Sequence, residues 1–161
     1  MRQKIPLVEK RKRLNILITA GPTQEPLDPV RFISNRSTGA VGYEIAKEAA
    51  LRRHRVTLIS GPTALTPPRS INFIKIDTAL EMRERLRELF NGADCLIMTA
   101  AVSDFRPERV SKSKISKTGK KALTVRLVRN PDILSELSLK KGGRVLAGFC
   151  LETRDGLRKA I

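Results

Sequence analysis

The sequence has no tryptophan, one tyrosine and five phenylalanines in 161 residues. Isoleucine, leucine, valine and alanine must therefore build the core, which is typical of buried parallel strands covered by helices. Cysteine is also scarce. Cys95 and Cys150 each lie in an apolar run, and we interpret both as reduced core thiols. Because they have no metal-ligand spacing, the sequence gives no support to a zinc site or a Cys-His nucleophile.

Long apolar runs are absent as well. No run reaches the ~18 residues of a membrane span, and residues 1–13 lack the apolar centre of a secretory signal. We therefore expect a cytoplasmic protein with no membrane association. The length favours a single domain. We predict a basic tail over 1–13 and one nucleotide-binding domain over 14–161.

Acidic residues are few. The chain has 32 lysines and arginines against 16 acidic residues, a net charge of +16. Such a field attracts anions, including nucleotides, phosphorylated metabolites and nucleic acids. The basic residues are spread along the chain, however, and aromatic residues are not interleaved with them as in a single-strand binding platform. The net positive charge leaves a basic RNA-binding domain as an alternative, but no nucleic-acid-binding motif supports it.

Strand-like and helix-like patterns alternate along the chain. Apolar or alternating runs predict strands over 14–20, 55–60, 71–76, 93–101, 122–128 and 144–150. Helical periodicity and caps predict helices over 38–53, 78–90 and 131–140, and another from about 154. Thr78 and Glu81 form a capping box, while Asn130 and Pro131 suit a cap and a first turn. The order predicts an α/β, Rossmann-like, doubly wound fold with a mainly parallel sheet and helices on both faces.

The connection over 21–37 is far longer than the usual 2–6 residues between a strand and its helix. It contains neither the dinucleotide fingerprint nor the P-loop motif. It ends in hydroxyls and a glycine at a predicted helix N-terminus, which favours an anion site built from Gly21, Ser37, Thr38 and Gly39. A simple Ser/Thr cap would explain the two hydroxyls, but not the long approach or Arg31 and Asn35.

Two polar features follow the strand predicted over 93–101. Asp104 suits an Asx turn, and it equally suits a hydrogen bond to a ribose hydroxyl. The lysine-rich run over 112–121 suits a solvated loop. Beside a phosphate site, the same run would close over a triphosphate and neutralise charge during transfer. The residues alone do not decide between the two interpretations of Asp104, or between the two interpretations of the lysine-rich run.

Five motifs together resemble phosphopantothenoylcysteine synthetase, the ligase of coenzyme A biosynthesis. They occur in the order and rough spacing of that family, over about residues 14 to 155: "ITAGPTQEPLDPVRFISNRSTGAVGYEIA", "TAAVSDFRP", "KISK", "RNPDIL" and "AGFCLET". The first motif is long enough to be highly specific. In many bacteria this ligase is the carboxyl-terminal half of a bifunctional flavoprotein. The archaeal-type phosphopantothenate synthetase lacks this first motif.

The resemblance implies that CTP activates 4'-phosphopantothenate as an acyl-cytidylate, which cysteine then attacks, with loss of CMP and pyrophosphate. It implies Mg²⁺, a homodimer and a flavoprotein decarboxylase partner, with no FMN in this chain. The metal ligands remain unknown. By motif position, the resemblance implies catalytic roles for Asn35, Arg31 and Lys114, and a phosphate contact for Lys117. It implies nucleotide contacts for the following residues: Met98, Thr99, Ala100, Asp104, Lys114, Asn130, Pro131, Asp132, Ile133 and Phe149.

The sequence departs from the family pattern at three points. Ser116 stands at the third position of the family's K-x-K-K loop, where the family has lysine, and Ala40 stands where the family often has lysine. The family also continues past this C-terminus, so we expect an incomplete ligase domain. A truncated, non-catalytic nucleotide-binding relative is therefore a second alternative. Neither the choice of CTP over ATP nor the reason for the surplus positive charge follows from the sequence.

Overall fold

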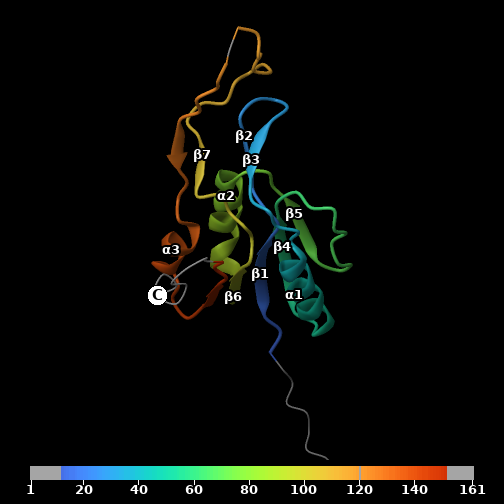
Figure 1. The fold of residues 1–161 in the computed structure, drawn as a ribbon. Coiled ribbons are helices and arrows are strands. Elements are labelled where there is room, and N and C mark those ends of the chain that lie inside the picture. The colour runs from blue at the N-terminus through green and yellow to red at the C-terminus, as the bar shows by residue number, and fades with distance from the viewer. Residues whose placement is uncertain (1–11, 120, 152–161) are drawn as a thin grey trace, which may run out of the picture.

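The computed structural model describes residues 12–119 and 121–151, and its centre is a five-stranded parallel sheet (Figure 1). The strands are β1 (Asn15–Ala20), β4 (Arg55–Ser60), β5 (Asn72–Lys75), β6 (Cys95–Met98) and β9 (Val145–Gly148). Their order across the sheet is β5-β4-β1-β6-β9, and every neighbouring pair is parallel. The chain therefore winds outward from β1 in both directions, as in a doubly wound fold. This confirms the predicted fold class.

Among the described residues, three α-helices cover the sheet. They are α1 (Ala40–Leu51), α2 (Ala79–Leu89), which continues into a 3₁₀ turn over Phe90–Gly92, and α3 (Ile133–Ser138). Alternate residues of a strand point to opposite faces. Accordingly, Ile16 and Ile18 of β1 pack with Tyr43, Ala46 and Ala49 of α1. Leu17 packs into the other cluster, with Met82 and Leu86 of α2 and with Ile133 and Leu137 of α3. The prediction of helices on both faces is confirmed.

The helix caps confirm one prediction and correct another. Thr78 caps α2, because its Oγ1 accepts a hydrogen bond from the Glu81 amide at 3.2 Å. The predicted cap at Asn130 is wrong. Asp132 is the N-cap of α3, its Oδ1 accepting from the Ser135 amide at 2.9 Å, so this helix is shorter than the predicted 131–140.

Two antiparallel strand pairs were not predicted. The long connection after β1 contains a hairpin of β2 (Gln24–Pro26) and β3 (Phe32–Ser34), and β7 (Phe105–Pro107) pairs with β8 (Leu127–Arg129). We call residues 24–34 and 105–129 (residue 120 apart) the hairpin lobe. It lies above the carboxyl ends of the central strands in Figure 1. The strand predicted over 122–128 is thus only β8, and it belongs to this lobe rather than to the central sheet.

Some predictions fall on residues that the structure does not describe. They are most of the predicted tail, over 1–11, and the helix predicted from about 154. Within 12–119 and 121–151, the helices are all too short or too polar to cross a membrane.

Candidate functional site

A cavity of about 710 Å³ lies where β6 and β9 end. Small-molecule sites are typically about 300–1,000 Å³ in volume. Its walls come from four stretches that are distant in the sequence: 35–36, 98–104, 129–134 and 148–151. In doubly wound folds, ligands bind at the carboxyl ends of the strands. We therefore take this cavity as the candidate site.

The cavity brings together most of the predicted site residues. Those that line it are Asn35, Met98, Ala100, Asp104, Asn130, Pro131, Asp132, Ile133 and Phe149. The parallel pairing of β6 with β9 places Met98 opposite Gly148, directly before Phe149. The amide of Phe149 donates to the Met98 carbonyl at 2.9 Å, which joins the two strand ends beside the cavity.

Asn35 reaches the cavity from the end of the hairpin lobe. Its Nδ2 donates a hydrogen bond to the backbone oxygen of Ala101 at 3.1 Å, in an exposed position. The Thr23 amide donates to the same oxygen at 3.2 Å. The carbonyl of Ala101 therefore anchors both the start of the hairpin lobe and the Asn35 side chain.

Asn130 is buried and holds the wall that carries Asp104. Its Nδ2 donates to the Ser103 carbonyl and its backbone N–H to the Asp104 carbonyl, both at 2.7 Å. Its Oδ1 accepts from Arg106 at 3.0 Å. Both the Nδ2 and the Oδ1 of Asn130 are therefore engaged, and the residue holds the backbone around Asp104 in place. Asp104 itself is exposed at the cavity.

The sequence reasoning missed several lining residues, among them two arginines and a serine. Arg36 and Arg129 add positive charge to the walls. Each is next in sequence to a predicted site residue, Asn35 or Asn130, and this position could have indicated them. Ser103 is buried, and its Oγ has no hydrogen-bond partner among the described residues. Its neighbour Asp104 could have drawn attention to it.

The residues of the predicted anion site are not among those that line this cavity. Gly21 follows β1, and Ser37, Thr38 and Gly39 directly precede α1. Gly39 is the N-cap in a left-handed conformation (φ 80°), and being glycine it has no side chain with which to cap the helix. Ser37 Oγ accepts from the Gly39 amide at 3.3 Å, and Thr38 Oγ1 from the Ala40 amide at 3.4 Å. A Cβ on Gly39 would lie 3.1 Å from the Gly21 amide nitrogen, so these glycines allow close backbone packing. Whether an anion binds there stays a prediction.

Thr99 and the predicted cations also lie outside the lining set. The Thr99 hydroxyl donates to the Thr19 carbonyl at 2.6 Å, which links β6 to β1. Arg31, Lys114 and Lys117 lie in the hairpin lobe, and both lysines are exposed. The guanidinium of Arg31 donates to Asp28 and to the Ile115 carbonyl, each at 3.1 Å. Lys114 is therefore not a lining residue of the cavity.

Of the two cysteines, Cys95 packs against the core as interpreted from the sequence, whereas Cys150 does not. Cys95 is half-buried, and burial, followed by the charge of Asp94, raises the pKa of its thiol. Cys150 is exposed and lines the cavity, so the interpretation of it as a core thiol is wrong. Its strand-like run ends at Gly148, before the cysteine is reached.

No cluster of three or more metal-ligating side chains occurs within 12–119 and 121–151. A second cavity, of about 530 Å³, lies between α1 and the loop over 65–70, lined in part by Tyr43, Lys47 and Arg69. None of the predicted site residues lines it, so we do not assign the site there.

Comparison with known proteins agrees with the fold and the motifs. The chain is 44% identical to the coenzyme A biosynthesis bifunctional protein CoaBC of Bacillus subtilis over 142 residues, 88% of this chain and 35% of that protein. It is 44% identical to the Escherichia coli K12 protein of the same name over 147 residues, 89% of this chain and 36% of that protein. The chain thus spans just over a third of the length of these relatives.

Solved structures give the same result. A crystal structure of the C-terminal domain of a CoaBC protein superposes with a TM-score of 0.80 at 39% identity, covering 91% of this chain and 69% of that one. The DNA/pantothenate metabolism flavoprotein from Streptococcus pneumoniae gives a TM-score of 0.73 at 26% identity, covering 83% and 67%. Residues 11–161 match the family "DNA/pantothenate metabolism flavoprotein C-terminal domain". The resemblance inferred from the motifs is therefore confirmed, and the chain belongs to this family.

Proposed function

We propose that this chain carries the ligase step of coenzyme A biosynthesis, the CTP-dependent joining of 4'-phosphopantothenate to cysteine. The observation that carries this proposal is the single cavity that gathers Asn35, Asp104, the 130–133 turn and Phe149 from four separate stretches. Its family and its relatives of coenzyme A biosynthesis support the same assignment.

In the first step, a carboxylate oxygen of phosphopantothenate attacks the α-phosphorus of CTP, and the bond to the departing pyrophosphate breaks. Two anions must approach each other, so positive charge has to surround them. Arg36 and Arg129 supply such charge at the cavity. Mg²⁺ would arrive with the CTP substrate and would offset part of the phosphate charge. Lys114 and Lys117 approach from the hairpin lobe to neutralise the leaving pyrophosphate.

In the second step, the amine of cysteine attacks the acyl carbon, and the bond to CMP breaks. The mixed anhydride must be kept from water until then, so neutral hydrogen-bond donors suit the site better than a general base. The Nδ2 group of Asn35 is such a donor at the cavity edge. The Asp104 carboxylate would accept from a ribose hydroxyl, and the 130–133 turn would border the base.

The test is an assay of the purified chain with CTP, Mg²⁺, phosphopantothenate and cysteine. During sustained turnover we expect CMP and pyrophosphate in equal amounts. Without cysteine, pyrophosphate release should stop after a single turnover and CMP should not appear; without phosphopantothenate, neither product should form. CTP binding without any CMP would instead support the non-catalytic nucleotide-binding alternative. That alternative has one observation in its favour, because Lys114 lies outside the lining residues of the cavity.

We also propose that the active form is a homodimer that uses the hairpin lobe. Several apolar side chains on the lobe are half or more exposed: Val30, Phe32, Phe105 and Val110. Exposed apolar side chains gathered on one part of a fold mark interaction surfaces. Light scattering of the purified chain tests this, and a strictly monomeric mass would refute it. The bifunctional relatives suggest a flavoprotein decarboxylase as the further partner.

A further inference from the structure

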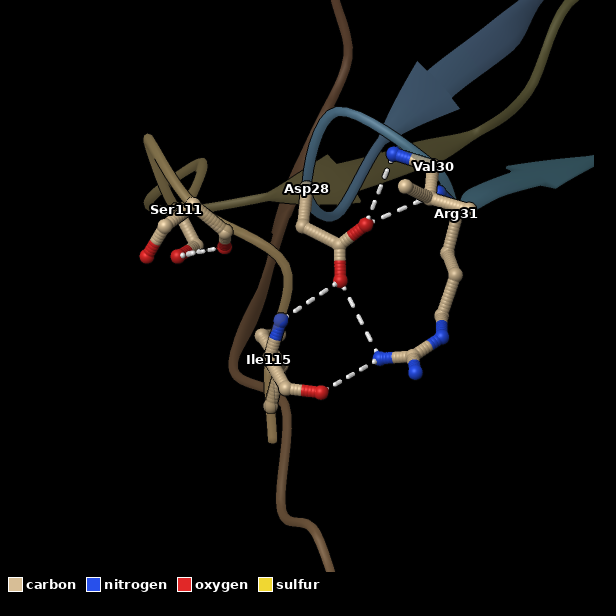
Figure 2. A network of polar contacts seen from close by, with 6 residues as sticks. Asp28, Val30, Arg31, Ser111 and Ile115 are labelled. Atoms are coloured by element: carbon tan, nitrogen blue, oxygen red, sulfur yellow. Dashed lines mark hydrogen bonds and ion pairs between the residues drawn. The ribbon is translucent and has the colours of Figure 1, made fainter. Parts of the chain in front are cut away.

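The Asp28 side chain lies in the turn between β2 and β3, and its two oxygens have different partners (Figure 2). Its Oδ1 accepts hydrogen bonds from the amides of Val30 and Arg31, at 2.8 and 2.9 Å. Its Oδ2 accepts from the Ile115 amide at 3.0 Å and from the Arg31 guanidinium at 3.1 Å. The side chain is fully buried, at 0% exposure. One oxygen thus shapes the turn, and the other binds a segment 87 residues away.

Two more contacts complete the attachment. The Arg31 guanidinium also donates to the Ile115 carbonyl at 3.1 Å, so Asp28, Arg31 and Ile115 close a ring. The Ser111 amide donates to the Leu27 carbonyl at 2.9 Å. The segment from 111 to 115 is therefore fixed at both ends to the turn between β2 and β3.

A buried carboxylate is costly unless hydrogen bonds and an opposite charge compensate it. Asp28 has both, and charge-assisted bonds of this kind are roughly twice as strong as neutral ones. The amide of Ile115, then those of Val30 and Arg31 and the Arg31 charge, outweigh burial and hold the pKa of Asp28 below its usual value. The carboxylate therefore stays ionised at neutral pH.

The amide that Asp28 accepts from belongs to the peptide bond between Lys114 and Ile115. Fixing that peptide bond fixes the backbone from which the Lys114 side chain projects. We propose that Asp28 is a positioning residue that holds the lysine-bearing segment 111–117 on the hairpin lobe, and so sets where Lys114 meets the phosphates. The catalytic part of this proposal rests on the proposed ligase function, whereas the attachment itself does not.

Asp28→Asn separates the two halves of the interaction. The asparagine oxygen can still accept from the Val30 and Arg31 amides, whereas its NH₂ group cannot accept from Ile115. Losing a hydrogen bond to a charged group costs about 1.5–3 kcal/mol, so we expect the Ile115 amide to exchange with solvent at least about 10-fold faster. The amides of β1 lie in the central sheet and exchange only when the whole fold opens, so their exchange rates should change less. Glu48→Gln, which breaks the 2.6 Å ion pair with Arg52 in α1, is the matched control.

Ile115→Pro removes the N–H that donates to Asp28, so it breaks the same hydrogen bond at the donor. It provides a second test in case Asp28→Asn does not fold. Trypsin should then cut faster after Lys117 in both variants, but not in Glu48→Gln. If Ile115 exchange and this cleavage match the parent in Asp28→Asn, the attachment is refuted, whether or not the chain is a ligase.

The catalytic part has its own readout. In Asp28→Asn, acyl-cytidylate formation should slow about 10-fold or more, the loss expected from a displaced charge. Reaction of the preformed intermediate with cysteine should keep the parent rate. If the Ile115 amide exchanges faster in Asp28→Asn but acyl-cytidylate forms at the parent rate, the positioning role is refuted. A parent chain that makes no acyl-cytidylate would refute the proposed function, and the exchange data would then decide on the attachment alone.

Discussion

Asn35 and Ala101 are 66 residues apart in the sequence and are joined by a hydrogen bond of 3.1 Å, from the side-chain Nδ2 of Asn35 to the Ala101 carbonyl. This contact connects the end of the hairpin lobe with the segment that leaves β6, at the edge of the 710 Å³ cavity. The contact therefore fixes the orientation of the Asn35 side-chain amide at the edge of the cavity.

Asn35→Asp should separate the two chemical steps. Aspartate cannot donate, and it places a negative charge beside the Ala101 carbonyl. We expect acyl-cytidylate to form and accumulate while overall turnover falls by about 10²-fold, the usual effect of losing one oriented donor. Rapid quenching with labelled CTP measures both quantities. Asn72→Asp, at a side-chain amide on β5 that donates to Thr57, is the control and should turn over normally. Parent-like turnover of Asn35→Asp would refute the role.

Lys114→Gln should slow the first chemical step, the formation of acyl-cytidylate. Removing one positive charge from the approach to the phosphates should lower acyl-cytidylate formation by about 10²-fold or more, with no intermediate accumulating. Lys112→Gln removes an equal charge two residues earlier and is the matched control. Equal losses in both variants would point to a general field effect, and would contradict a specific role for Lys114.

Gly42→Ala should destabilise the fold. A Cβ there would lie 2.5 Å from both Ala20 Cβ and Thr99 Oγ1, and 2.9 Å from the Thr19 carbonyl oxygen. Overpacking costs about 1–3 kcal/mol, and the close β1 atoms cannot easily move aside. The gain in helix propensity, up to about 1 kcal/mol, should not offset this. Urea denaturation measures the change. Gly92→Ala meets nothing within 4 Å and should be neutral. Equal stabilities would show that α1 lies further from β1.

The two cysteines should differ in reactivity. Burial and the Asp94 charge raise the pKa of Cys95, so its thiol stays protonated near neutral pH and reacts slowly. Cys150 is exposed on the cavity wall and should be alkylated first. CTP should slow the alkylation of Cys150 and leave Cys95 unchanged, as mass spectrometry of the labelled peptides can show. Faster labelling of Cys95, or no protection of Cys150, would contradict the position of the site.

What could be predicted from the sequence was local or periodic. Thr78 and Glu81 are three residues apart, so their capping box was visible, and the apolar runs indicated the central strands. At α3, three residues suited to a helix start follow one another, and periodicity could not choose between Asn130 and Asp132. In the hairpin lobe, the alternating run over 122–128 indicated only β8. The other three strands, β2, β3 and β7, were missed because each is only three residues long.

The resemblance of the motifs implied Met98, Ala100 and Phe149 as site residues. They line one cavity because parallel strands leave their carboxyl ends at one edge of the sheet. The attachment of Asp28 to Ile115 depends on chain folding over 87 residues, and no local pattern encodes it. For the same reason, the sequence did not indicate that Lys114 lies outside the lining residues.

The most direct test of the account is a crystal structure of this chain with CTP and Mg²⁺. The account predicts the nucleotide in the cavity beside β6 and β9, with a ribose hydroxyl within hydrogen-bond distance of Asp104 and the base bordered by the 130–133 turn. Nucleotide bound elsewhere, for example in the cavity beside α1, with the candidate site empty, would contradict it.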